Sequence, residues 1–223
     1  MKYFIICAIG ILVQLFFIKA DREKKYLLAV VLKATASLIF VILGLICSQE
    51  STDSEFAKMV IIGLVCGMLG DILLNLRYLF KKIEVIIFLV GILVFSAGHV
   101  FYLLALLPLC SNRLLAFSIC FVLTVLLLIW ILPKIEAELP FKIFGVFYVG
   151  IILMMTSVAL INHLSFPQIN SLIYLTGALL FTVSDIILIF KTFGKDGKGN
   201  IRINDLLLYY LGQLAIAISL LFI

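Results

Sequence analysis

Eight long apolar segments, separated by short polar breaks, are the feature that most constrains this chain. The segments cover residues 2–20, 26–47, 59–76, 83–107, 114–132, 143–161, 171–190 and 205–223. A helix needs about 20 mainly apolar residues to cross the hydrocarbon core of a bilayer, and each segment is close to that length. No break is long enough to hold a soluble domain. The sequence therefore predicts one all-α polytopic membrane domain over residues 1–223, with eight transmembrane helices.

Composition excludes the other broad classes. Hydrophobic residues make up 65% of the chain and charged residues 13%, which is about half the charged share of soluble proteins. A soluble fold cannot bury that much apolar surface, because its outside must be wetted. A soluble domain, a disordered chain and a disulfide-rich secreted module are all excluded.

The first segment also has some features of a signal peptide, because Lys2 precedes an apolar run. That run is about twice the usual length of a signal-peptide core. No small-x-small cleavage site precedes Asp21. We therefore expect residues 2–20 to form a spanning helix.

The distribution of basic residues predicts the orientation. The first, third, fifth and seventh breaks, with Lys19 counted in the first, hold 13 Lys and Arg residues. The opposite side holds only Lys2, Lys58 and Arg113. By the positive-inside rule the odd breaks are cytoplasmic and both termini lie on the non-cytoplasmic side, in the inner membrane if the cell is bacterial. The net charge of +5 is thus a topology signal rather than a nucleic-acid footprint.

The five cysteines show neither zinc-binding nor redox spacing. Cys7, Cys66 and Cys120 lie within spans, where we expect them to pack as small apolar residues. Cys47 and Cys110 fall at outer helix ends. We expect two unpaired thiols there, with a disulfide as the alternative in an oxidising compartment.

Four ionisable residues lie at membrane depth, where a charge is costly and is by default a functional candidate. They are Lys33, Asp71, His99 and Asp185. Asp71 and Asp185 each lie about five residues before the cytoplasmic end of a span, which places them roughly 8–10 Å below the inner surface. Further polar residues enter from the same side, namely Tyr148, Tyr209, Tyr210 and Gln213. This convergence predicts a pocket open to the cytoplasm or the inner leaflet.

Each candidate also has a purely structural interpretation. Lys33 can snorkel to the interface, and interfacial tyrosines are common belt residues. Asp71 and Asp185 can pair with Lys33, Arg77 or Lys191. One buried lysine cannot neutralise two buried carboxylates at matched depth, however, so the pair of aspartates favours a functional role.

A short internal repeat has an offset of 114 residues. Residues 70–74 (Gly-Asp-Ile-Leu-Leu) resemble residues 184–188 (Ser-Asp-Ile-Ile-Leu), and the same offset places Gly98-His99 on Gly212-Gln213. The spans involved run in the same direction. This pattern predicts a parallel duplication of four helices in which Asp71 and Asp185 are equivalent.

Four motifs together resemble the YhhN family of membrane proteins, which includes the mammalian lysoplasmalogenases. They are Gly-Asp-Ile-Leu-Leu at 70–74, Gly-His-Val-Phe-Tyr at 98–102, Gly-Ala-Leu-Leu-Phe-Thr-Val-Ser-Asp at 177–185 and Tyr-Tyr-Leu-Gly-Gln at 209–213. The motifs occur in family order across the second to eighth spans.

The resemblance implies hydrolysis of the vinyl ether bond of a lysoplasmalogen, which releases a fatty aldehyde and a glycerophospho-head group. That reaction needs a protonated carboxylic acid, an anion to steady an oxocarbenium ion and a base for water. Burial and mutual repulsion keep one of two carboxylates protonated while the other stays ionised. The hypothesis makes Asp71 and Asp185 catalytic and needs no metal or organic cofactor. The substrate-binding candidates are Lys33, His99, Tyr102, Tyr148, Ser184, Tyr209, Tyr210 and Gln213, with Arg77 and Lys191 available for the phosphate.

The expected partners are a lysophospholipid substrate and the lipid bilayer, with no nucleic acid and no protein partner. A three-histidine zinc site fails because His99 and His163 are the only two histidines. A serine triad fails because Ser96 and Ser184 lack the Gly-x-Ser-x-Gly context. The main alternative is a small proton-coupled transporter that uses the buried Asp, Lys and His cluster. A purely structural membrane subunit would leave the aspartate pair unexplained.

Overall fold

The computed structural model describes residues 1–195 and 202–222, and side chains of the last helix from residue 205 onward. This part of the chain forms eight α-helices, each long and apolar enough to span a membrane, and contains no β-strand. The helices are α1 (Lys2–Arg22), α2 (Tyr26–Ser48), α3 (Ser54–Leu76), α4 (Glu84–Leu106), α5 (Arg113–Ile131), α6 (Leu139–Ser165), α7 (Ile169–Phe193) and α8 (Arg202–Ser219). Short 3-10 turns cover Lys81–Ile83, Leu107–Leu109, Leu132–Lys134 and Leu220–Phe222. The predicted eight-helix class is confirmed.

Two helices begin four or more residues before their apolar segments. α3 begins at Ser54, five residues before the predicted start, because the Asp53 side chain accepts a 2.9 Å hydrogen bond from the backbone N–H of Phe56 and so caps the helix. α6 begins at Leu139 because Pro140 is tolerated in a first turn, where its missing N–H has no partner to lose. Residues 196–201 of the seventh predicted break lie outside the described residues.

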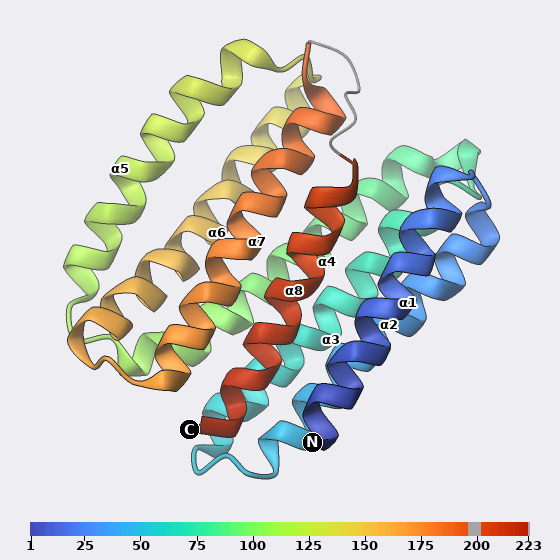
Figure 1. The fold of residues 1–223 in the computed structure, drawn as a ribbon. Coiled ribbons are helices and arrows are strands. Elements are labelled where there is room, and N and C mark those ends of the chain that lie inside the picture. The colour runs from blue at the N-terminus through green and yellow to red at the C-terminus, as the bar shows by residue number, and fades with distance from the viewer. Residues whose placement is uncertain (196–201, 223) are drawn as a thin grey trace.

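The helices run up and down, so both termini lie at one end of the bundle (Figure 1). The opposite end carries the turns between α1 and α2, α3 and α4, and α5 and α6, and there α7 ends and α8 begins. We call this the basic end, because the predicted cytoplasmic breaks lie there. Its assignment to a membrane face remains a prediction.

The main core is formed by α2, α3, α4, α6, α7 and α8, and α5 contributes only Ala116 to its buried residues. The most extensive contacts join α3 with α4 and α7 with α8. α5 lies at the edge of the bundle (Figure 1) and packs mainly on α6. Its large side chains face outward, with Phe121 62% and Ile129 67% exposed, as lipid contact requires. All five cysteines are unpaired, as expected.

Candidate active site

A cavity of about 440 Å³ lies inside the basic end of the bundle. Seven helices, all but α5, contribute to its wall, which is mostly apolar. Asp21, Arg77, Glu84 and Lys191 line it close to the helix ends, so the cavity opens at the basic end. Its wall includes six of the residues predicted from the sequence: Lys33, Asp71, Tyr148, Ser184, Asp185 and Tyr209.

Asp71 is held by three polar groups on one carboxylate oxygen. Ser37 Oγ and Tyr209 OH donate hydrogen bonds of 2.5 Å and 2.9 Å to Asp71 Oδ2. Lys33 Nζ lies 3.3 Å from the same oxygen, and the two side chains of this ion pair are only 2% and 6% exposed. This setting compensates a negative charge, because a cation and two hydroxyl donors replace the lost water.

Lys33 is a buried cation with unused donors. Its ammonium pairs with Asp71 and lies 4.3 Å from the centroid of the Tyr209 ring. It completes no well-aligned hydrogen bond with any described residue. The alternative interpretation, in which Lys33 snorkels to the interface, is not seen, since the whole residue is 1% exposed.

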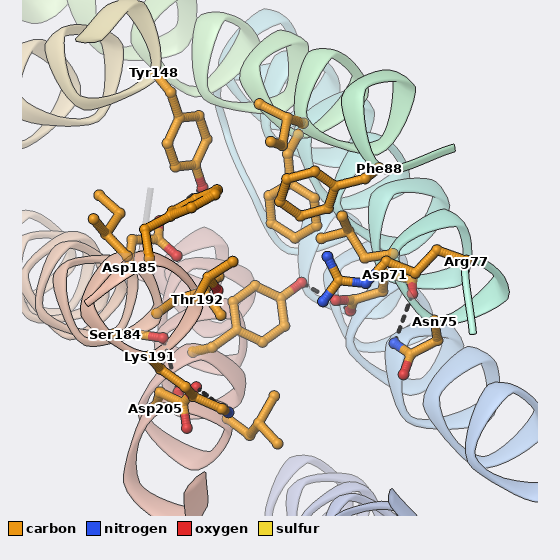
Figure 2. Close-up of a pocket in the computed structure, with 18 of the residues that line it drawn as sticks. Asp71, Asn75, Arg77, Phe88, Tyr148, Ser184, Asp185, Lys191, Thr192 and Asp205 are labelled. Carbon is orange, nitrogen blue, oxygen red and sulfur yellow. Dashed lines mark hydrogen bonds and ion pairs between the residues drawn. The ribbon is translucent and has the colours of Figure 1, made fainter. Parts of the chain in front are cut away.

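Asp185 has a different environment. Tyr148 OH donates a 2.8 Å hydrogen bond to Asp185 Oδ2, and no described cation forms an ion pair with this carboxyl group. Asp185 is 6% exposed. Figure 2 shows Asp71 and Asp185 on opposite walls of the cavity, with Tyr148 above Asp185. The two aspartates therefore share one cavity but differ in their partners.

Small residues on α3 allow these contacts. Gly67 lies one helical turn before Asp71, and a Cβ there would stand 2.9 Å from Gln213 Nε2 and 3.6 Å from Tyr209 OH. A Cβ at Gly70 would overlap the Phe95 ring of α4. Glycine at these positions lets α4 and α8 approach α3 closely enough for Tyr209 to reach Asp71.

A chain of two hydrogen bonds holds the Tyr209 hydroxyl group in position. Tyr102 OH donates to Gln213 Oε1 at 2.7 Å, and Gln213 Nε2 donates to Tyr209 OH at 3.3 Å. All three side chains are buried. Tyr102 and Gln213 do not line the cavity, so the structure places them as supports of Tyr209 rather than in the wall.

His99 and Tyr210 also lie outside the cavity wall. His99 Nδ1 lies 2.9 Å from the carbonyl oxygen of Phe95, and its ring packs edge-on against Phe181 with centroids 4.4 Å apart. Tyr210 OH donates to the carbonyl oxygen of Ala36 at 3.0 Å. These contacts fit a packing role for both residues.

A second buried ion pair joins Lys191 Nζ and Asp205 Oδ2 at 2.8 Å. Lys191 therefore pairs with Asp205 rather than with Asp185, and Ser184 Oγ donates to the Asp205 carbonyl oxygen at 2.8 Å. Arg77, by contrast, forms no ion pair with a described residue. Its guanidinium stacks 4.5 Å from the Phe88 ring centroid and donates to Tyr78 OH. Arg77 is thus the cation at the mouth that keeps its charge available.

The contact of Ser37 with Asp71 and the pairing of Asp205 with Lys191 were not expected from the sequence. The signal for Ser37 was its position four residues after Lys33, on the same helix face. The described residues contain no group of three or more His, Cys, Asp or Glu side chains suited to a metal ion.

The helices and the cavity define a polytopic membrane protein with two buried carboxylates facing one another across an internal pocket. The chain belongs to the YhhN family, whose family model matches residues 28–220, most of the chain. That family includes lysoplasmalogenases. No curated protein and no solved structure gives a significant match.

Proposed function

We propose that the protein hydrolyses the vinyl ether bond of lysoplasmalogen-type lysolipids to a fatty aldehyde and a glycerophospho-head group. One observation carries the proposal: two buried carboxyl groups line one cavity, and among the described side chains only one of them has a cation partner. Family membership supports it, because the YhhN family includes lysoplasmalogenases.

The different environments suggest different roles for the two aspartates. Burying an ionised carboxylate without a cation costs several kcal/mol, so Asp185 is the group that stays protonated and acts as the acid. Lys33, Ser37 and Tyr209 compensate a charge on Asp71, which acts as the carboxylate. One protonated carboxyl group and one ionised carboxyl group in the same site are a usual arrangement for acid–base catalysis.

The proposed reaction begins when Asp185 delivers its proton to the outer carbon of the vinyl ether. The electron pair of the double bond forms the new C–H bond, and the ether oxygen shares the positive charge as an oxocarbenium ion. Asp71 stabilises that cation electrostatically and accepts a proton from the attacking water. The resulting hemiacetal gives its hydroxyl proton back to Asp185 as its bond to the glycerol oxygen breaks. The glycerol oxygen takes the proton that Asp71 received, and the aldehyde is released.

The head group would lie at the cavity mouth. Arg77 is six residues, or about 9 Å, closer to the basic end than Asp71, and its charge is not used by another described side chain. A guanidinium binds a phosphate through paired N–H donors. We therefore assign the phosphate to Arg77, and we assign Lys33 to holding Asp71 ionised.

The test is aldehyde release by purified protein from a panel of lysolipids, with and without a vinyl ether. General acid–base catalysis contributes about 10²–10⁴-fold, so Asp71→Asn and Asp185→Asn should each lower turnover by at least 10²-fold. Glu55→Gln, at an exposed site on α3, is the matched control and should keep wild-type turnover. Retention of near wild-type turnover by both aspartate variants would refute the catalytic pair.

A proton-coupled transporter remains the alternative class. The cavity floor argues against it, because Phe95 and Tyr209 line the cavity, are each 6% exposed or less, and pack on the buried ring of Phe181. If the wild-type protein cleaves no lysolipid in the panel but carries a proton-linked flux in liposomes, the transporter replaces the enzyme.

A further inference from the structure

α4 and α6 form one side of the cavity, and two residues there are loosely covered. Gly145 of α6 lines the cavity, and a Cβ built on it would meet no atom within 4 Å. Val85 of α4 lines the same cavity yet is 52% exposed. We call this part of the wall, formed by Val85, Phe88, Phe141 and Gly145, the α4–α6 opening.

The two helices are joined more firmly at the other end of the bundle. There Asn162 Nδ2 donates a 3.0 Å hydrogen bond to the carbonyl oxygen of Leu106. Within the α4–α6 opening, the rings of Phe88 and Phe141 are in contact, with centroids 5.8 Å apart. Figure 1 shows α4 and α6 diverging toward the basic end. The α4–α6 opening therefore extends from Val85, next to Glu84 at the mouth, to Gly145 in the cavity wall, with the two rings between them.

The position of the opening matters for a lipid with one chain. Gly145 is three residues, or about 4.5 Å along the helix axis, from Tyr148, whose hydroxyl group binds Asp185. The floor beneath Asp71 and Asp185 is packed, and the mouth is lined by charged groups. At about 440 Å³ the cavity is near the lower end of the roughly 300–1,000 Å³ that drug-sized ligands occupy. A long alkyl chain has no place inside together with a head group.

We propose that the α4–α6 opening is a lateral port that receives the unbranched hydrocarbon chain of the substrate, and that Gly145 sets the bulk it admits. The head group stays at the mouth and the chain remains in the bilayer, so little apolar surface has to leave lipid. This inference rests on the proposed function, because it uses a lysolipid as the occupant.

Substitution at Gly145 tests the port, with Gly150 as the matched control. Both glycines lie on α6 with empty space at the Cβ position, but only Gly145 lines the cavity. Gly145→Leu should lower kcat/KM for a long-chain vinyl ether lysolipid at least about 10-fold, and for a short-chain analogue less than about 2-fold. Gly150→Leu should leave both values near wild type. Equal losses for the two chain lengths, or equal losses for the two variants, would overturn the port.

A binding experiment separates this inference from the proposed function. The probe is a non-cleavable saturated alkyl ether lysolipid with a diazirine in mid-chain, photolysed with the purified full-length protein in detergent. We expect labelled peptides from residues 85–92 of α4 and 141–148 of α6, and labelling reduced at least about 5-fold in Gly145→Leu but not in Gly145→Ala. Labelling confined to other helix pairs would overturn the port. Labelling at the port by a protein that cleaves nothing would uphold the port and reject the hydrolase.

Discussion

At the scale of single residues, partners rather than depth distinguish the two buried aspartates. Asp71 and Asp185 have almost the same exposure, 4% and 6%. Asp71 accepts two hydroxyl donors and pairs with Lys33, whereas Asp185 accepts one hydroxyl donor. Their matched positions in the internal repeat gave no reason to expect this difference.

Lys33→Met tests the role of the buried ion pair. Removing one partner leaves an uncompensated buried carboxylate, which typically costs 3–5 kcal/mol, so the free energy of unfolding should fall by about that much. The double variant Lys33→Met/Asp71→Asn should recover most of the lost free energy of unfolding, because it leaves no unpaired charge of this ion pair buried. Unfolding curves in detergent measure both. If the double variant is as unstable as the sum of the single variants, the ion pair has no such role.

Tyr148→Phe tests the hydrogen bond that Asp185 receives. One hydrogen bond contributes about 0.5–1.5 kcal/mol, so turnover should fall by about 2- to 10-fold while the protein stays folded. Tyr174→Phe is the control, because its hydroxyl makes only a long 3.5 Å contact with the Tyr102 carbonyl oxygen. The measurement is the rate of aldehyde release by each variant. An equal loss of turnover in the two variants would count against a specific role for Tyr148.

At the scale of helices, the two tightest pairs are built alike. A Cβ at Gly98 of α4 would stand 3.1 Å from the Gly63 carbonyl oxygen of α3, and a Cβ at Gly212 of α8 would stand 2.9 Å from the Gly177 carbonyl oxygen of α7. Each glycine of the first pair precedes its counterpart by the same 114 residues that separate Asp71 and Asp185. This match favours the predicted duplication, which stays a prediction.

Gly212→Ala tests this close packing. The new methyl group meets backbone atoms of α7 that cannot move aside, so the melting temperature should fall, at a cost of about 1–3 kcal/mol. Gly150→Ala has open space at Cβ and replaces a poor helix former, so the melting temperature should stay equal or rise. Thermal unfolding followed by circular dichroism measures both. A larger loss for Gly150→Ala than for Gly212→Ala would contradict the contact.

At the scale of the whole molecule, the cavity and the basic residues lie at the same end. By the positive-inside rule we expect the cavity mouth at the cytoplasmic face and both termini on the other side. A substrate delivered from the inner leaflet would reach the mouth and the α4–α6 opening without crossing the membrane.

Single-cysteine labelling tests this orientation. In a background without the five native cysteines, Ser51→Cys between α2 and α3 should react with an impermeant reagent applied from outside. Lys81→Cys between α3 and α4 should react only after the membrane is opened. Labelling of the Lys81→Cys variant in intact cells would reverse the orientation and move the cavity mouth to the outer face.

The amino-acid order alone was enough to predict the eight helices and the burial of both aspartates. Both rest on local facts, since a helix spans the bilayer when its own apolar segment matches the bilayer thickness, and a residue inside such a segment lies within the membrane. Which side chains meet was set by the tertiary structure. In the folded protein the His99 ring packs against Phe181, and Lys191 forms an ion pair with Asp205. Ser37 donates a hydrogen bond to Asp71. Such pairings depend on how each helix is rotated about its axis and how closely its neighbours approach, and those quantities are set by packing between residues far apart in the chain.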